Sequence, residues 1–584
     1  MTGKERVVYG LLCLFLFLYI ILRSIHVPLV HDEVATYVYY VLSGEWVPWL
    51  AHVDANNHTL NSLLSIGFDR LLGTHSWSLR LANGLGFIVL AVYVFKFSRR
   101  YSHPVFRWAF ILGILGSHYA IEFFALSRGY GLALAFFIGV LYHFEEYLST
   151  RKSAQVWALS VFMLLCLSAS LTYLFPCLIL GALLVIRATN SSSERRAIIP
   201  VLWTILVLIF AVALSFWLKS HGALYYGSEG NFWNRTLSSL GRYLVGDGSV
   251  APYALLGMGL FVFVDLMQYR THFPLGQAIA ARFIHLLLLG SVMGIFLSHY
   301  ILGTHYPEDR VALYLYPLLI AGFIQAVQEL SISQAAKTAV ASLLFVLPIH
   351  FLLNMNLDHV DFLYRERVPA SFFAEIENFE SEEGRLPSVS GYHTMTLSYM
   401  MSARLDGHSV PAMVHHNYPE SDADFILLRA DDGLTAPPGH RQVTFDEVSG
   451  NSLWREASAS RMELLTTREA TGQELQSEFY ELLRIKVAGE GHYLAELTVE
   501  YPDGSPPTPL TVVLNIQNPQ KETVAYVPYQ MDWRYEQDDP VLRTTLFADG
   551  DGQAENELVI YIWNREQVPV KGLDHRLRIF QSSK

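Results

Sequence analysis

Two adjacent carboxylates, Asp32 and Glu33, follow the first strongly apolar stretch of the chain by about one helical turn. Ionisable side chains are costly to keep near lipid and often mark a functional site in a membrane protein. A carboxylate in partly dry surroundings becomes a stronger base, and segment 26–78 around this pair is rich in tyrosine and tryptophan. We therefore expect Asp32, with Glu33 in reserve, to take a proton from an incoming hydroxyl group. The alternative is that Asp32 caps a surface helix beginning near Val34.

Three arginines stand where other apolar stretches meet polar loops, and they suit a phosphate group. Arg80 and Arg128 each lie at the start of an apolar stretch, and Arg310 begins another after the sequence GTHYPED. A guanidinium at a helix N-terminus can bind a phosphate and stabilise it as a leaving group. Two of these arginines also have a structural interpretation. Arg80 could snorkel toward water, and Arg128 could form an ion pair with the nearby Glu122.

Further polar candidates lie in the loops that we expect on the same side of the membrane: Asn57, His58, His305, Tyr306, Glu308 and Asp309. The last two could instead cap the helix that follows them. The chain has neither a phosphate-binding P-loop nor a glycine-rich dinucleotide motif, so a nucleotide site is not expected. No cofactor and no metal site are predicted. A divalent cation stays an option that no residue pattern indicates.

The composition divides the chain into two regions that need different solvents. The sequence is 52% hydrophobic and only 16% charged, with a mean hydropathy of +0.29. Apolar stretches fill residues 7–356 and then disappear, which is typical of a membrane region followed by a soluble one. The net charge of −12 comes mainly from the second region and makes nucleic acid an unsuitable partner. The three cysteines all fall in apolar stretches, so no disulfide framework is expected.

A lipid bilayer is therefore the first expected partner, crossed by segments of about 20 apolar residues. We expect about eleven transmembrane helices, at 7–25, 79–98, 106–123, 127–147, 155–170, 172–187, 197–218, 252–269, 279–301, 311–329 and 337–356. Alternate loops are rich in lysine and arginine, which places them and the N-terminus in the cytoplasm. The candidate residues and the C-terminal region then lie outside the cytoplasm, which we interpret as the periplasmic side of a bacterial inner membrane.

The polar region changes its pattern along the chain. Residues 357–472 alternate helical and strand-like runs, which indicates an α/β domain. Residues 473–584 contain runs with period-two alternation separated by turn residues, which is typical of a β-sandwich. Such a sandwich could bind carbohydrate or rest on the membrane domain, and its fold alone does not choose between these roles.

Several motifs of residues 1–356 resemble the GT-C superfamily of integral-membrane glycosyltransferases. The likeness is strongest to protein O-mannosyltransferases and aminoarabinose transferases. The matching stretches are HDE at 31–33, NNHTL at 56–60, SLRLANGL at 78–85, IEFFALSRGYGLALAFF at 121–137 and YPEDRVALYLYPL at 306–318. Each is loose alone, but their order is more specific than any one of them.

The resemblance implies an inverting transfer of a sugar from a polyprenyl phosphate to an acceptor outside the cytoplasm, which would be a glycan, a lipid or a protein hydroxyl. It places the catalytic aspartate at Asp32. It also assigns Arg80, Arg128 with Tyr130, and Arg310 to the site. Many relatives carry another acidic residue around the arginine-tyrosine segment, for which Glu122 is the nearby candidate here.

Two other classes of function stay open. A transporter or flippase of lipid-linked glycans would share the membrane helices, although the chain shows no obvious repeat of its halves. A non-catalytic envelope protein could display the β-sandwich, but the polar loops of the membrane region would then have no role.

Overall fold

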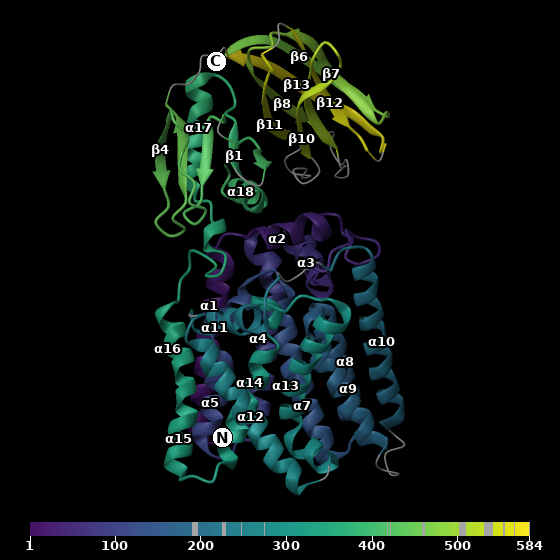
Figure 1. Cartoon of the computed structure of the whole chain (residues 1–584), viewed down its shortest axis with the longest axis vertical. Helices are drawn as coiled ribbons and strands as arrows, with labels where there is room; N and C mark the ends of the chain where they lie inside the picture. Colours follow the sequence, from purple (N-terminus) through teal and green to yellow (C-terminus); the bar gives the residue numbers. More distant parts are fainter. Residues whose placement is uncertain are drawn as a thin grey trace. The chain divides into compact units, whose positions relative to one another are not determined.

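The computed structural model contains two compact units (Figure 1). The helical unit comprises Met1–Val27 and Tyr39–Phe362, and the β-rich unit comprises Pro28–Val38 and Leu363–Lys584. The structure describes all residues except 190–196, 225–228, 247, 274, 417–418, 421, 458–461, 501–509, 531–540, 553–554, 566 and 583–584. The connections on either side of the expected span 197–218 therefore lie partly outside the described residues.

The helical unit consists of long apolar helices joined by short connections. They are α1 (Gly3–His26), α3 (Thr59–Leu72), α4 (Ser76–Ser98), α5 (Pro104–Leu115), α6 (His118–Glu122), α7 (Gly129–Thr150), α8 (Ser153–Ala169), α9 (Leu174–Thr189), α10 (Ile198–Ser220), α11 (Ser238–Val245), α12 (Ala251–His272), α13 (Leu275–Leu302), α14 (Leu315–Glu329), α15 (Gln334–Ser342) and α16 (Val346–Leu353). Helix α14 lies in the interior, where Leu315–Val327 are all buried. By contrast, α10 exposes one apolar face, as expected of a helix in contact with lipid.

The polytopic helical architecture is confirmed, but the expected count of eleven spans is not. Among the described residues, eight helices are long and apolar enough to cross a membrane. A ninth span results if α5 and the segment His118–Ala125, which are bent by 57°, are taken together. The expected spans 155–170 and 311–329 correspond to α8 and α14, which have only 17 and 15 residues. The apolar content predicted both helices, but each is shorter than the roughly 20 residues that usually cross a bilayer.

Glycine permits a close approach where α7 begins. A methyl group at Gly129 would overlap the carbonyl oxygen of Ala169 and lie 2.8 Å from the Cβ atom of His58. The N-terminus of α7 therefore packs directly against the C-terminus of α8 and the residue that precedes α3. This contact brings three segments that are far apart in the sequence to one end of the helical unit.

The β-rich unit contains a mixed sheet and a β-sandwich. The mixed sheet has the order β2-β1-β3-β5-β4 and carries helices α17 (Ala370–Glu383) and α18 (His393–Leu405). The sandwich has two antiparallel sheets, β10-β9-β12-β7 and β11-β8-β13-β6. The strands of the mixed sheet are β1 (Val389–Tyr392), β2 (Met413–His416), β3 (Phe425–Leu428), β4 (His440–Phe445) and β5 (Ser452–Glu456). Those of the sandwich are β6 (Glu463–Leu475), β7 (Phe479–Val487), β8 (His492–Glu500), β9 (Thr511–Gln517), β10 (Thr523–Gln530), β11 (Val541–Asp549), β12 (Asn556–Trp563) and β13 (Val570–Ser582).

The mixed sheet and the sandwich are joined by polar contacts as well as by the chain. Arg543 of β11 pairs with Glu380 of α17 at 2.5 Å. The Leu386 amide donates to Glu496 of β8 over 2.8 Å. The fold class expected for this region, α/β followed by a β-sandwich, is confirmed, whereas the domain boundary at 472/473 stays a prediction.

The orientation across the membrane also stays a prediction, and cysteine labelling tests it. Ser331, between α14 and α15, and Ser477, between β6 and β7, are both exposed. We expect Ser477→Cys to react with a membrane-impermeant maleimide in intact cells and Ser331→Cys to react only after permeabilisation. The unmodified chain, with its three native cysteines, gives the background. Labelling of both positions from the same side would contradict the topology.

Candidate active site

Asp32 and Glu33 lie on α2 (His31–Thr36), a short helix in the β-rich unit. Glu33 is fully buried, and its Oε2 accepts a hydrogen bond of 3.2 Å from the Val30 amide. A glutamate at the third helical position commonly fixes a helix start in this way. Because α2 begins at His31 and Glu33 makes this contact, the interpretation of Asp32 as the cap of a helix starting near Val34 is wrong. Asp32 is partly exposed, so its carboxylate is the better candidate for a base.

Arg80 is completely buried and binds the C-terminal end of α1. Its Nη1 atom donates to the Val27 carbonyl over 2.6 Å and lies 3.4 Å from the Ser24 carbonyl. A cation that binds the last carbonyl groups of a helix also complements the helix dipole. These contacts give Arg80 a structural role in holding α1 against α4. Its role in binding phosphate stays a prediction.

Four of the predicted site residues lie near one another where α7 begins: Asn57, His58, Arg128 and Tyr130. Arg128 is buried and donates from Nη2 to the side chain of Asn56, next to Asn57. The His58 ring lies edge-on to Tyr130 with 4.6 Å between centroids. His58 Nδ1 is also 2.7 Å from the Ala169 carbonyl, which fixes the ring. Glu122, which the structural alternative would pair with Arg128, instead forms an ion pair with Arg23.

A cavity of about 250 Å³ opens beside this group. Its lining combines the polar side chains of Asp54, Asn57 and His58 with apolar side chains of α8 and α10. The lining residues are Trp46, Val47, Pro48, Trp49, Asp54, Ala55, Asn57, His58, Thr59, Leu164, Leu167, Ser168, Ser170, Leu171, Val207, Phe210, Ala211, Leu214 and Leu218. A ligand with a polar head and an apolar chain would match this combination. Sequence reasoning missed the apolar lining, because a wall shared by two spans has no signature in either of them.

The loop before α14 holds the remaining predicted residues. Asp309 adopts a left-handed backbone conformation with φ of 49°, and its amide donates a hydrogen bond to Ser239 Oγ over 2.7 Å. Burial, together with the charge of Glu308, raises the pKa of Asp309 above its usual range. Glu308 stands at the cap position of the short helix Asp309–Ala312 but makes no capping hydrogen bond there. A left-handed conformation in a residue other than glycine often occurs at functional sites.

An aromatic wall links Arg310 of this loop to the start of α7. The Arg310 guanidinium lies 5.9 Å from the Phe362 ring centroid. Phe362 is 5.4 Å from Phe123, and Phe123 is 5.2 Å from Tyr130. In the same loop, Tyr306 is buried and stacks on His299 at 4.2 Å, whereas His305 is exposed. The helical unit therefore connects Arg310 with Tyr130 through successive ring contacts.

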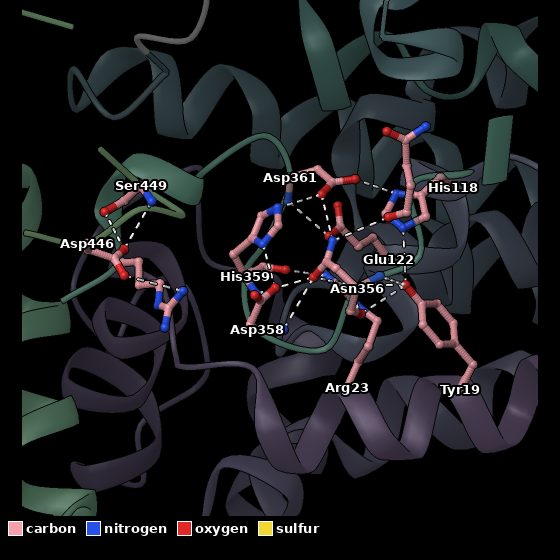
Figure 2. Close-up of polar contacts among 12 residues, drawn as sticks. Tyr19, Arg23, His118, Glu122, Asn356, Asp358, His359, Asp361, Asp446 and Ser449 are labelled. Atoms are coloured by element: carbon pink, nitrogen blue, oxygen red, sulfur yellow. Dashed lines mark hydrogen bonds and ion pairs between the residues drawn. The ribbon is translucent and has the colours of Figure 1, made fainter. Parts of the chain in front are cut away.

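A buried polar cluster, which we call the Arg23 cluster, consists of Arg23, His118, Glu122, Asn356, His359 and Asp361 (Figure 2). It adjoins the aromatic wall in sequence, since Phe123 follows Glu122 and Phe362 follows Asp361. Arg23 and Glu122 are almost completely buried and form an ion pair. Arg23 also donates to the carbonyls of Asn356 and His359, each over 2.8 Å, and the Asp361 amide donates to Glu122 over 3.0 Å. The cluster thus binds the segment that follows α16 to α1 and α6. Sequence reasoning named Glu122 but missed its partners. The signal for Arg23 was a lone arginine inside an apolar stretch.

Asp361 is the carboxylate of the Arg23 cluster that lies outside the spans. Its Oδ2 is 2.6 Å from His118 Nδ1, and its Oδ1 is 3.0 Å from His359 Nε2. Burial would raise the pKa of Asp361, but hydrogen bonds from the two histidines outweigh burial and hold this pKa well below its usual range. Burial would lower the pKa of His359, but hydrogen bonds to Asp361 and Asp358 raise it. Asp361 is therefore ionised at neutral pH.

The Arg23 cluster also offers a set of groups that metals use. His118, Glu122 and Asp361 each present a ligand atom within 4.8 Å of the others, and Glu122 Oε2 has no hydrogen-bond partner among the described residues. However, Arg23 already supplies a positive charge to Glu122. Asp361 is likewise paired with His118. The donor set therefore fits an internal ion-pair cluster better than it fits a divalent cation.

Comparison with known proteins gives matches in structure only. No family model and no curated protein sequence matches the chain. Two solved structures of ArnT from Cupriavidus metallidurans resemble it. One, bound to undecaprenyl phosphate, is 12% identical with a TM-score of 0.42 and covers 79% of this chain and 99% of that chain. The other, in the apo state, is 14% identical with a TM-score of 0.41 and covers 78% and 98%.

The arabinosyltransferase EmbB from Mycobacterium smegmatis is a further similar structure. It is 10% identical with a TM-score of 0.41, and the match covers 98% of this chain and 65% of that chain. Likenesses at this level carry no argument about activity, so a function for this chain has to be inferred from its own residues.

The Arg23–Glu122 pair gives a direct test of the Arg23 cluster. Removing one partner strands a buried charge, so Arg23→Met or Glu122→Gln should each lower the free energy of unfolding by about 3–5 kcal/mol. The double variant should lose less than the sum of the two. Thermal unfolding in lipid nanodiscs measures this, with Lys486→Met, which breaks an exposed pair with Glu555, as the unaffected control. Additive losses would show that the two side chains do not act as a pair.

Proposed function

We propose that the protein is an integral-membrane glycosyltransferase that moves a sugar from a polyprenyl-phosphate donor to an acceptor hydroxyl group outside the cytoplasm. The observation that carries the proposal is the cavity beside His58, whose lining combines polar loop residues with apolar side chains of α8 and α10. A lipid-linked sugar has the same combination. Its isoprenoid chain would lie against Phe210 and Leu214, and its phosphate would lie toward the loop residues.

Arginine would bind the phosphate and stabilise the charge that develops as it leaves. Arg128, which binds Asn56 next to the lining residue Asn57, and Arg310, at the far end of the aromatic wall, are the two candidates in the helical unit. The left-handed Asp309 next to Arg310 supports a functional role for that loop. Phosphate is a good leaving group, so the donor side of the reaction needs no general acid.

The acceptor side needs a base. In the proposed reaction the acceptor oxygen attacks the anomeric carbon, the carbon–oxygen bond to phosphate breaks, and the hydroxyl proton passes to a carboxylate. Attack from the face opposite the phosphate inverts the anomeric centre. Asp32 is the proposed base, because Glu33 is engaged in fixing the start of α2.

The cavity is tested by filling it. Leu214→Trp places a larger side chain in the apolar lining and should raise the KM for a polyprenyl-phosphate sugar about tenfold or more, with a smaller effect on kcat. Leu202→Trp on the same helix is the matched control, because Leu202 is 59% exposed and does not line the cavity. Initial rates with purified protein in nanodiscs give both constants. Equal KM values in the two variants would remove the donor from this cavity.

The base is tested by two isosteric substitutions. Asp32→Asn cannot accept the proton and should leave a folded protein that binds the donor but loses transfer by about 100-fold or more. Glu33→Gln should keep near-normal transfer, because glutamine can make the same contact at the helix start. Transfer of radiolabelled sugar measures both. Loss in Glu33→Gln alone would move the role to Glu33, and full activity in both would remove α2 from the chemistry.

A further inference from the structure

One face of the β-sandwich carries a group of exposed aromatic side chains. On the sheet β10-β9-β12-β7, Phe479 of β7 is 55% exposed and Tyr526 of β10 is 45% exposed. Tyr561 and Trp563 of β12 are partly exposed between them. Large apolar surfaces on a soluble domain usually mark a binding site. We call these four residues the aromatic platform.

Strand register places the platform on the outer face of the sheet. Side chains alternate along a strand, and in β12 the intervening residues Leu558, Ile560 and Ile562 are buried in the core. Trp563 and Tyr561 therefore point away from the core, and Trp563 stands directly opposite Phe479. The opposite face of this sheet packs into the core of the sandwich. Core packing therefore does not account for these exposed rings.

The rings form a continuous surface. The planes of Phe479 and Trp563 are within 11° of parallel with centroids 6.0 Å apart, and Tyr561 is 5.8 Å from Phe479. Partial burial and a hydrogen bond with Tyr526 raise the pKa of Tyr561 to about 12. The Tyr526 hydroxyl therefore meets Tyr561 across β9. Aromatic faces attract the weakly positive C–H groups of a ligand, and the flat faces of sugar rings consist of such groups.

A buried amide oxygen lies within this face. Asn515 of β9 is only 7% exposed, and its Oδ1 has no hydrogen-bond partner among the described residues. Asn515 stands opposite Tyr526 on one side and Val559 on the other, so its side chain points to the outer face. A buried acceptor without a partner is costly. A donor from a ligand, such as a hydroxyl group, would satisfy it.

The charges on the same face neutralise one another. Arg484 pairs with Glu481 at 2.7 Å and with Glu557 at 2.6 Å, and Lys521 pairs with Glu557 at 2.5 Å. Paired charges of both signs do not select for an anionic or a cationic ligand. They do offer hydrogen-bond donors and acceptors at the edge of the aromatic surface, which suits a ligand rich in hydroxyl groups.

We propose that the outer face of the sheet β10-β9-β12-β7 binds a neutral oligosaccharide, stacked on the aromatic platform and hydrogen-bonded to Asn515. Sugar rings would lie along Trp563, Phe479 and Tyr561, with Asn515 Oδ1 accepting from a hydroxyl group. The site is separate from the cavity of the helical unit and does not depend on the proposed transfer reaction.

The test uses the full chain in lipid nanodiscs, free of detergents with sugar headgroups. Isothermal titration is carried out with four neutral hexasaccharides: maltohexaose, cellohexaose, mannohexaose and arabinohexaose. We expect at least one of them to bind. Trp563→Ala and Phe479→Ala should each weaken that binding about tenfold or more, since one aromatic contact contributes on the order of 1.4 kcal/mol. Asn515→Leu, which keeps the branched shape but removes the acceptor, should also weaken it.

Phe445→Ala is the matched control, because Phe445 is a 50% exposed phenylalanine on β4 of the same unit and lies outside the platform. Thermal unfolding confirms that each variant is folded. The proposal is wrong if no hexasaccharide binds the unmodified chain at millimolar concentration. It is also wrong if binding survives the double substitution Trp563→Ala and Phe479→Ala. A change of oligomeric state in these variants, without sugar binding, would instead identify a protein interface.

Discussion

A charge inside an apolar helical bundle has to be paired, and the ion pair between Arg23 and Glu122 meets this requirement in the helical unit. Arg23 belongs to α1, Glu122 to α6, and the carbonyl groups that complete the arginine's contacts belong to the segment after α16. Because both charged groups are almost completely buried, none of the three segments can shift without stranding one of them. The pair therefore specifies how the start and the end of the helical unit fit together.

The candidate site depends on this arrangement. Phe362 directly follows Asp361 of the Arg23 cluster, and its ring lies close to both Phe123 and the Arg310 guanidinium. Phe123 in turn contacts Tyr130, whose ring lies against His58 in the lining of the cavity. A structural ion pair and the candidate site thus share one set of packed side chains. Polar chemistry lies at the ends of the helices, where the cost of keeping it near lipid is least.

The sequence alone predicted the architecture better than it predicted contacts. Apolar length identified the helices, and period-two alternation in FYELLRIKV and ELVIYIW identified strands of the sandwich, because both patterns report burial locally. The start of α7 directly after Arg128 was also predicted to within two residues. Pairing was not: Arg80 binds the end of α1, and Glu122 pairs with Arg23 rather than with Arg128. These contacts join residues 50 or more positions apart, and no local pattern encodes such distances. The aromatic platform was missed for the same reason, since its rings come from three strands.

The central claim is that the cavity between α8 and α10 holds the lipid part of a polyprenyl-phosphate donor. Photo-crosslinking measures this directly. A polyprenyl phosphate that carries a diazirine on an isoprene unit near the phosphate is bound to the protein in nanodiscs. The sample is then illuminated, and the crosslinked residues are identified by mass spectrometry. We predict adducts on Leu164, Phe210 or Leu214, which unlabelled polyprenyl phosphate suppresses. Adducts confined to the apolar groove between α9 and α10, at Leu178 and Val185, or adducts that excess unlabelled lipid does not suppress, would contradict the account.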